Sequence, residues 1–425
     1  MIRKFFAENF CSIKNRIDIS FEASALTDET YYNNFFDYQD DKILKVVSFY
    51  GMNASGKSTI TRAFAALREL IVPTPNMQQI IGAFQNPQFN PIIPYFPFEF
   101  CNETKHKPIS LGIEFSLDND ANSFLYKYSV TYDRQRILDE KFEKKTSQKD
   151  SLLFKRATNE AGVTEINVGS NASNIALLNS LADSVMPNRT FLSMFNVFKV
   201  PDFYDAYQFF ADRLVNISPE ITRFHDVVPN RIMANEGLKK FTIKLLKAAD
   251  FNISDINVKK TSAKVAPIMP GLMAEKDTLF MVHEGDLDTG SIEFLKESLG
   301  TKKIVILAEH LYPVLSKPSV LIIDELESSL HPDLTRLIVT CFLDETINVH
   351  NSQLIFTSHE TSLLDLDLLR RDEINFVYKD KKTCATYIRS LNDFHVRKTD
   401  SIEKSYLAGR YLTSPDVNNN YLMEN

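Results

Sequence analysis

The chain has 425 residues, of which 44% are hydrophobic and 24% are charged, and its formal net charge at pH 7 is −7. No apolar run approaches the ~18 residues that a membrane-spanning helix needs, and the N-terminus lacks the apolar segment of a secretion signal. We therefore expect a cytoplasmic protein without a membrane partner. The negative charge provides no general attraction for nucleic acid, so nucleic-acid binding would require a local basic surface.

The cysteines give no sign of a disulfide framework or a zinc site. Cys11, Cys101, Cys341 and Cys384 lie far apart in the sequence and form no C-x-x-C pair. Both kinds of site normally require paired cysteines at short, regular spacings. We expect these residues to be free thiols in the core.

A phosphate-binding loop is predicted at residues 51–58. The segment G-M-N-A-S-G-K-S has the spacing G-x-x-x-x-G-K-S, follows the apolar run 45–50 and precedes a helical pattern at 59–70. Backbone N–H groups at this spacing can surround a phosphate, while Lys57 reaches the outer phosphates and the Ser58 hydroxyl binds Mg²⁺. The following helix points the positive end of its dipole at the same anion. A chance Gly/Ser turn is the alternative, but the strand–loop–helix context favours a nucleoside triphosphate site.

The middle of the chain carries weaker signals. Residues 110–115 and 124–130 alternate in polarity, which predicts half-exposed antiparallel strands beside the nucleotide-binding core. Apolar residues recur at helical spacing between about 175 and 249, which predicts a helical insertion. No sustained heptad repeat is present, so we expect a short lobe and no long coiled-coil arms. The aromatic stretch 191–210 is interpreted as core or subunit interface, with a base-stacking platform as the alternative.

One predicted helix in this insertion is basic. Its lysines, with others nearby, are Lys239, Lys240, Lys244, Lys247, Lys259, Lys260 and Lys264. These side chains could neutralise nucleic-acid phosphates. The alternative is the solvated face of an amphipathic helix, because Glu236 precedes Lys240 by four residues and predicts an ordinary helical ion pair.

A polar turn precedes the next helical pattern. Residues 297–301 read E-S-L-G-T, and the apolar residues that follow have helical spacing. Ser298, Gly300 and Thr301 at a helix N-terminus could bind an anion. Taken alone, the same residues are also typical of a plain helix cap with a flexible turn.

Two further apolar strands end in polar residues. Residues 319–323 lead to Asp324 and Glu325, and residues 353–358 lead to His359. A carboxylate at Asp324 would hold Mg²⁺, and Glu325 could orient the attacking water or accept its proton. Strand C-termini in a parallel sheet face the ligand, so His359 could contact the γ-phosphate. The alternatives are two solvated acids and an ordinary strand-end histidine.

The order of these motifs resembles a known group of proteins. Phosphate loop, long insertion, E-S-x-G-T turn, I-I-D-E-L-E-x-S-L-H-P at 322–332 and T-S-H at 357–359 resemble the ATP-binding-cassette-class ATPases of the SMC, RecF and OLD group. The resemblance is closest to the compact prokaryotic branch associated with abortive infection and phage defence. It covers both ends of the chain well and the middle poorly. The turn has one glycine where transporter-like members have two.

The resemblance implies an α/β fold in which an ABC-ATPase head carries a short helical insertion. The head would combine a phosphate-loop core sheet with flanking antiparallel strands. We expect an N-terminal lobe at 1–160 with the phosphate loop, a mainly helical insertion or lid at 161–275, and a C-terminal lobe at 276–425. The C-terminal lobe would contain the signature turn, the acidic strand, the interface loop 328–331 and the switch histidine.

The resemblance also assigns roles to residues. Lys57, Glu325 and His359 would be catalytic, and Ser58 and Asp324 would hold Mg²⁺. ATP would be bound by Gly51, Asn53, Ala54, Ser55, Gly56, Lys57, Ser58 and Thr59. Ser298 and Gly300 would contact the γ-phosphate held by the opposite subunit, so that two ATP molecules lie between two heads. The glutamine that commonly joins the lobes stays open among Gln78, Gln79, Gln85 and Gln88.

The implied function is an ATP-hydrolysing switch in anti-phage defence. It would act as a homodimer or higher oligomer, respond to a phage-derived trigger and control a separate effector, such as a Toprim-type nuclease or a toxin. No nuclease-like cluster is evident outside the ATPase motifs, and we find no Toprim segment. One alternative is a RecF- or SMC-like repair or recombination ATPase that acts directly on DNA. Another is a transporter ATPase subunit, which the short insertion argues against.

Overall fold

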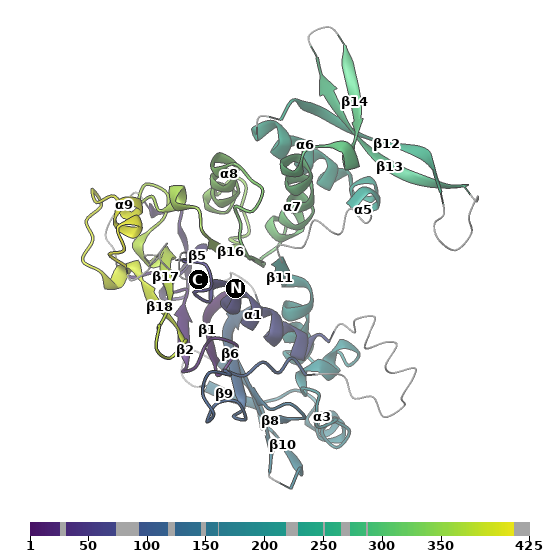
Figure 1. Cartoon of the computed structure of the whole chain (residues 1–425). Helices are drawn as coiled ribbons and strands as arrows, with labels where there is room; N and C mark the ends of the chain where they lie inside the picture. Colours follow the sequence, from purple (N-terminus) through teal and green to yellow (C-terminus); the bar gives the residue numbers. More distant parts are fainter. Residues whose placement is uncertain are drawn as a thin grey trace, which may run out of the picture.

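The computed structural model describes residues 1–25, 31–73, 93–117, 124–145, 150–159, 161–217, 228–249, 251–264, 273–285 and 288–411. The candidate glutamines 78, 79, 85 and 88 lie outside these residues. Figure 1 shows a central region that contains the start of helix α1 (Lys57–Ile71), with one lobe below it and another above. No described helix is long and apolar enough to cross a membrane.

The centre of the molecule is a six-stranded sheet that is mostly parallel. Its order is β11 (Leu214–Ile217), β15 (Val320–Ile323), β16 (Gln353–Ser358), β5 (Val46–Gly51), β17 (Ile374–Lys379) and β18 (Thr386–Ser390). Only β18 pairs antiparallel with its neighbour. Every residue of β5, β15 and β16 is buried, as expected where strands are covered on both faces. The predicted α/β class is therefore confirmed.

Helix α1 covers this sheet because its apolar residues follow helical spacing. Ile60, Phe64, Leu67 and Ile71 are fully buried. Helix α8 (Pro332–Leu343) follows β15, and α9 (Ile402–Leu407) lies near the C-terminal end of the described chain. The small strands β3 (Phe35–Tyr38) and β4 (Asp41–Leu44) form a separate hairpin before β5. Short helical turns lie at η2 (Leu192–Asn196), η3 (Phe209–Arg213), η5 (Phe294–Lys296), η6 (Thr361–Leu363), η7 (Arg371–Glu373) and η8 (Leu391–Asp393).

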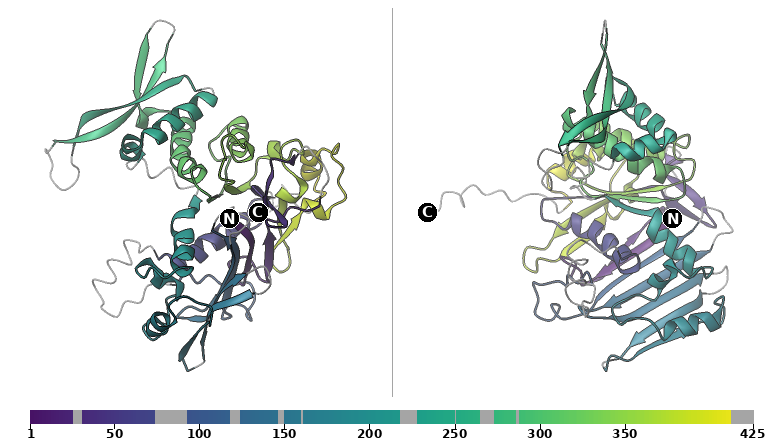
Figure 2. Two further views of the ribbon diagram at one scale, coloured as in Figure 1. Left: turned by 180° about the vertical axis from the view of Figure 1, so that it is seen from behind. Right: turned by 90° about the vertical axis from the view of Figure 1, so that its right-hand side faces the viewer.

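The lower lobe is a seven-stranded antiparallel sheet, seen as a broad layer in Figure 2. Its order is β10 (Thr164–Val168), β9 (Asp150–Thr158), β8 (Ile137–Lys145), β7 (Leu125–Tyr132), β6 (Ile109–Ser116), β1 (Ile2–Glu8) and β2 (Ile17–Ser20). Burial alternates along β7 in the way that the polarity pattern predicts. Helices α3 (Ile175–Ala182) and α4 (Phe203–Gln208) belong to this lobe. Phe191, Phe195 and Phe203 are fully buried, which supports the core interpretation of the aromatic stretch.

The upper lobe combines helices with a long hairpin. It contains α5 (Val228–Ala234), α6 (Glu236–Ala248), α7 (Leu299–Leu315), β12 (Ile253–Lys264), β13 (Met273–Glu284) and β14 (Thr289–Glu293). The β12–β13 hairpin projects away from the rest of the molecule in Figure 1.

The described part of 161–275 thus differs from the mainly helical insertion that the sequence predicts. It also contains β10, β11, β12 and the start of β13, and β11 belongs to the core sheet. The physical reason is that four residues of β11 gain their stability from pairing with β15, a partner more than a hundred residues away. The expected lobe boundary at 160 falls between the paired strands β9 and β10, and the expected boundary at 275 falls within β13. The lobes therefore interleave along the chain.

Candidate nucleotide-binding site

Three neighbouring parallel strands bring the predicted motifs to one edge of the core sheet. β15, β16 and β5 pair in register, with Ile323 beside Phe356 and Ser358 beside Tyr50. Their carboxyl ends therefore meet, as in other open α/β sheets. The loop 51–58 follows β5, Asp324 and Glu325 follow β15, and His359 follows β16. The Lys57 Nζ lies 3.3 Å from His359 Nδ1, although these residues are about 300 positions apart.

The loop before α1 requires glycine at two positions. Gly56 has φ of +108°, and a Cβ there would lie 2.1 Å from Thr386 Oγ1. A Cβ on Gly51 would lie 2.2 Å from the carbonyl oxygen of Val377 on β17. Ala54 also has positive φ, at 61°. Such left-handed and closely packed backbone is typical of a loop whose N–H groups turn toward an anion.

Hydroxyl groups from distant segments support the first turn of α1. Ser12 Oγ lies 2.9 Å from Thr59 Oγ1, and Thr386 Oγ1 lies 2.8 Å from Ser12 Oγ and 2.9 Å from the Ser55 carbonyl oxygen. Sequence reasoning missed Ser12 and Thr386, because neither belongs to a motif. By contrast, the buried Ser55 Oγ has no hydrogen-bond partner among the described atoms. Such an orphaned hydroxyl, in a loop with glycines at its tight positions, fits a phosphate ligand.

Lys57 is held inside its own loop. Its ammonium group donates to the carbonyl oxygens of Gly51 at 2.7 Å and Met52 at 3.0 Å, and the residue is only 5% exposed. Burial lowers the pKa of Lys57 to about 8, an effect that nearby carboxylates, led by Glu327, oppose. A buried ammonium with such weak compensation is a suitable partner for the charge of a triphosphate.

Asp324 and Glu325 share one threonine. The Thr357 hydroxyl donates to Asp324 Oδ1 at 2.7 Å and accepts from the Glu325 N–H at 2.8 Å. Glu325 has φ of 53°, an uncommon conformation for a non-glycine residue. Strain of this kind is held in place by its surroundings, and it is often found at functional sites. Thr357 was not singled out from the sequence; its position beside Ser358 and His359 was the available signal.

His359 and Glu327 are joined through the backbone. The His359 N–H donates to Glu327 Oε1 at 2.7 Å. Burial, and then the Lys57 ammonium, lower the pKa of His359 below its ordinary value. The imidazole is therefore neutral near pH 7, so one ring nitrogen can donate a hydrogen bond and the other can accept one. Sequence reasoning gave Glu327 no role, although the residue stands in the motif at 322–332.

The predicted signature turn forms a capped helix start. Ser298 Oγ accepts from the Thr301 N–H at 3.1 Å, and Leu299 is 64% exposed. A Cβ on Gly300 would have as its nearest neighbour the Ser329 carbonyl oxygen, at 3.7 Å. Gly300 of the turn therefore lies beside Ser329 of the loop 328–331. The cap interpretation is confirmed, and contact of Ser298 and Gly300 with a second copy stays a prediction.

The basic face is partly neutralised. Lys239 lies 3.1 Å from Asp255, and Lys240 lies 3.7 Å from Glu236, as the i,i+4 spacing predicts. Lys240, Lys244 and Lys247 are exposed on α6, whereas the Lys264 side chain lies outside the described residues. Nucleic-acid binding by this face stays a prediction.

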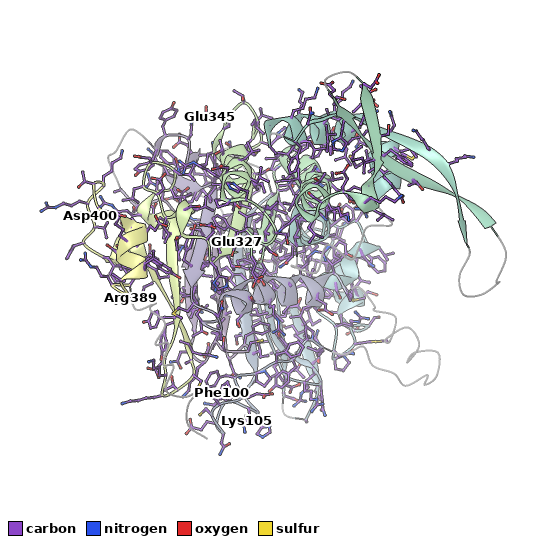
Figure 3. The ribbon with its side chains drawn as sticks, turned by 45° about the horizontal axis from the view of Figure 1, so that its top comes forward. Phe100, Lys105, Glu327, Glu345, Arg389 and Asp400 are labelled. Atoms are coloured by element: carbon purple, nitrogen blue, oxygen red, sulfur yellow. The ribbon has the colours of Figure 1, made fainter. Side chains whose placement is uncertain are left out.

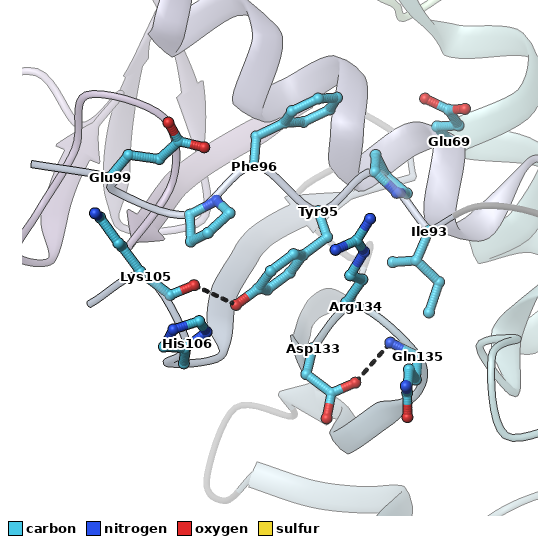
Figure 4. A pocket seen from close by; sticks show the side chains of 12 residues that line it. Glu69, Ile93, Tyr95, Phe96, Glu99, Lys105, His106, Asp133, Arg134 and Gln135 are labelled. Carbon is cyan, nitrogen blue, oxygen red and sulfur yellow. Dashed lines mark hydrogen bonds between the residues drawn. The ribbon is translucent and has the colours of Figure 1, made fainter. Parts of the chain in front are cut away.

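A large surface hollow lies on the flank of α1, in the part of the chain that the structure describes. Its volume is about 890 Å³, and Figure 4 shows Tyr95, Phe96, Lys105, Asp133 and Arg134 around it. It contains none of the predicted site residues. Its acidic and basic side chains do not favour one class of ligand.

The described residues contain no cluster of three or more His, Cys, Asp or Glu side chains that could hold a metal ion. Mg²⁺ commonly binds through one or two carboxylates together with substrate phosphates. Ser58, in the first turn of α1, and Asp324, which follows β15, have the oxygen ligands for such binding.

Comparison with known proteins identifies the family. Residues 46–365 match the family described as "AAA domain, putative AbiEii toxin, Type IV TA system". The chain belongs to this family. The match includes every predicted site residue, and the expected likeness to ATPases of abortive-infection systems is confirmed. A search of curated proteins found no significant match to this chain.

Solved SMC heads are similar over most of the chain. The SMC head domain from Thermotoga maritima is 13% identical, with 92% of this chain and 98% of that chain covered and a TM-score of 0.43. An Smc head from Pyrococcus furiosus, with an extended coiled coil and bound to the C-terminal domain of ScpA, is 12% identical. There the coverage is 97% and 99%, and the TM-score is again 0.43. At these scores the likeness carries no part of the functional argument.

Lys57→Ala is expected to abolish ATP binding, because it removes the ammonium group that is held inside the loop. The loss should be at least about 100-fold in affinity, in line with a charge-assisted contact to phosphate. Titration with a fluorescent ATP analogue measures it. Lys105→Ala, which removes an exposed lysine that lies outside the loop, is the control. Equal affinity of the Lys57→Ala and parent chains would contradict the assigned site.

Proposed function

We propose that this chain is a Mg²⁺-dependent ATPase that acts as a switch in an anti-phage, abortive-infection defence system. The observation that carries the proposal is the meeting of Lys57, the Asp324–Glu325 pair and His359 at the carboxyl ends of β5, β15 and β16. Each of these side chains has a place in phosphoryl transfer to water, and no other described site combines them.

The roles follow from the contacts. Lys57 neutralises the outer phosphates, and Ser58 and Asp324 hold Mg²⁺, which would supply charge compensation on the phosphate oxygens. Thr357 keeps Asp324 and Glu325 in place. The water oxygen bonds to the γ-phosphorus, the bond to the ADP oxygen breaks, and Glu325 accepts the proton released by the water. The neutral His359 donates a hydrogen bond to the γ-phosphate and so distinguishes ATP from ADP.

Two copies are proposed to complete the site. Ser298, the exposed Leu299 and Gly300 lie at the N-terminal end of a 17-residue helix, and Gly300 lies beside Ser329 of the loop 328–331. A helix N-terminus attracts phosphate, so this surface on one copy would fit the γ-phosphate held by another. Dimerisation would then depend on ATP and report hydrolysis.

The effector is proposed to be a separate protein, such as a Toprim-type nuclease or a toxin. Support comes from the family description, which refers to a toxin–antitoxin system and therefore to a partner protein. A phage-derived signal would act as the trigger. Direct action on DNA, as in RecF-like repair, is the second candidate, and the exposed stripe of Lys240, Lys244 and Lys247 favours it.

Glu325→Gln should retain ATP binding and slow turnover by about 100-fold or more, because the amide cannot accept the proton. Phosphate release under saturating ATP and Mg²⁺ measures kcat, and chelation of Mg²⁺ should stop release from the parent chain. Glu345→Gln is the control and should keep the parent rate, because this side chain is exposed and its ion pair with Lys45 is long, at 4.0 Å. A parent-like kcat for Glu325→Gln would place the base elsewhere.

Ser298→Arg should prevent ATP-dependent dimerisation while each chain still binds ATP, since the bulky side chain blocks the helix start but not its own phosphate loop. Light scattering with the Glu325→Gln background and ATP·Mg²⁺ gives the mass. Ser316→Arg places the same side chain at the exposed opposite end of α7 and should still dimerise. Equal masses for both arginine variants would refute the composite site.

Affinity purification of the Glu325→Gln chain from its host, with ATP and Mg²⁺, tests the biological assignment. A nuclease or toxin in stoichiometric amount is the expected result. DNA without such a protein, lost after Lys240→Glu and Lys244→Glu changes, would favour the repair alternative.

A further inference from the structure

Glu327 occupies a central place that the ATPase motifs leave unassigned. It lies in the loop after β15 and near the middle of the molecule in Figure 3, where the control residue Glu345 lies at the periphery. Its Oε1 atom accepts the His359 N–H at 2.7 Å. Its Oε2 atom is buried and has no hydrogen-bond partner among the described atoms. An unsatisfied buried carboxylate oxygen is costly, so this atom is available for a further donor.

Lys303 connects the same loop to the helix that begins at the signature turn. It is only 5% exposed, lies in the second turn of α7 and donates to the carbonyl oxygens of Leu326, at 3.3 Å, and Ser328. These carbonyls belong to the two residues that flank Glu327. An ammonium group has three N–H donors, so two backbone contacts leave one donor for a carboxylate. Movement of α7 would therefore be transmitted to Glu327.

Electrostatics link these groups further. Burial lowers the pKa of Lys303 to about 8, and among the charges that oppose this shift Glu327 is the largest. Glu327 has the same relation to Lys57. Among nearby carboxylates, Glu327 thus has the largest effect on the pKa of two buried lysines, one from the phosphate loop and one from the signature helix, and its Oε1 atom also accepts from the backbone of the switch histidine.

We propose that Glu327 and Lys303 are positioning residues that couple the signature helix α7 to His359. On this proposal, which rests on the composite ATPase described above, docking of a second copy on the start of α7 shifts Lys303. The shift moves the segment 326–328, and Glu327 then sets the position of the His359 backbone and imidazole against the γ-phosphate. Dimerisation is thereby converted into hydrolysis, and a single chain with bound ATP hydrolyses it slowly.

The test measures turnover for each ATP-bound dimer. Glu327→Gln is nearly isosteric and keeps an oxygen that can accept the His359 N–H, while it removes the charge and replaces the second acceptor oxygen with an NH2 donor. Lys303→Met keeps the apolar stem and removes the donors, while Lys303→Arg keeps charge and donors. ATP stoichiometry and dimer mass are measured for every variant, so that an inactive or unfolded fraction does not count as slow turnover. Glu345→Gln is the matched carboxylate control.

We expect Glu327→Gln and Lys303→Met to bind ATP and dimerise, with turnover per dimer reduced about tenfold in each, a loss within the range of coupled networks. The turnover of the double variant should fall no further than that of either single variant, because both changes break the same link between α7 and His359. Lys303→Arg should regain most of the parent rate. A change that only weakened the fold would lower the melting temperature and the ATP stoichiometry and leave turnover per bound dimer unchanged.

Parent-like turnover per dimer in Glu327→Gln would overturn the proposal, as would losses that multiply in the double variant. If Lys303→Met fails to fold, the comparison of Glu327→Gln with Lys303→Arg decides: slow turnover in the first and parent-like turnover in the second support the link. Absence of ATP hydrolysis in both the parent and Glu345→Gln chains is a different result, which refutes the ATPase function itself.

Discussion

The structure depends on the parallel pairing of three buried strands, β15, β16 and β5. Their registers fix where each strand ends, and the residues after those ends form the proposed site. Because side chains in a strand alternate between two faces, a shift of one residue in β16 would turn Thr357 away from Asp324 and Glu325. Burial on both faces makes such a shift costly. The sheet is thus the element that converts motifs separated by hundreds of residues into one constellation.

Two of the charged groups at this edge, both lysines, are held in a nearly dry environment. Lys57 and Lys303 are both 5% exposed, and each relies on backbone carbonyl oxygens and on Glu327 for compensation. Buried charges that lack full pairing are expensive, and proteins retain them mainly at functional sites. A triphosphate and Mg²⁺ would bring the missing charges. This explains why one edge of an otherwise apolar sheet contains lysines, carboxylates and a neutral histidine together.

Sequence reasoning located the parts of the site that lie at the ends of apolar runs. The loop 51–58, Asp324, Glu325 and His359 carry spacing that has a direct chemical meaning, so their place at one sheet edge was predictable. Ser12 and Thr386 act through contacts with partners distant in sequence, and no motif marks them. Thr357 and Glu327 stand inside the quoted motifs, but their contacts with Glu325 and His359 depend on the pairing of distant strands. The strand β11 was missed for the same reason. Its stability comes from β15, whereas helical periodicity, which is local, dominated the prediction for 161–275.

The most direct test of the central claim, that two copies share each site, is a mixing experiment. Chains with Lys57→Ala and chains with Ser298→Arg are each expected to be inactive, because one lacks the phosphate-loop lysine and the other lacks the signature surface. A mixed dimer contains one intact site, built from the phosphate loop of the Ser298→Arg chain and the signature of the Lys57→Ala chain. The account predicts that mixing restores phosphate release. A mixture as inactive as either chain alone would contradict it.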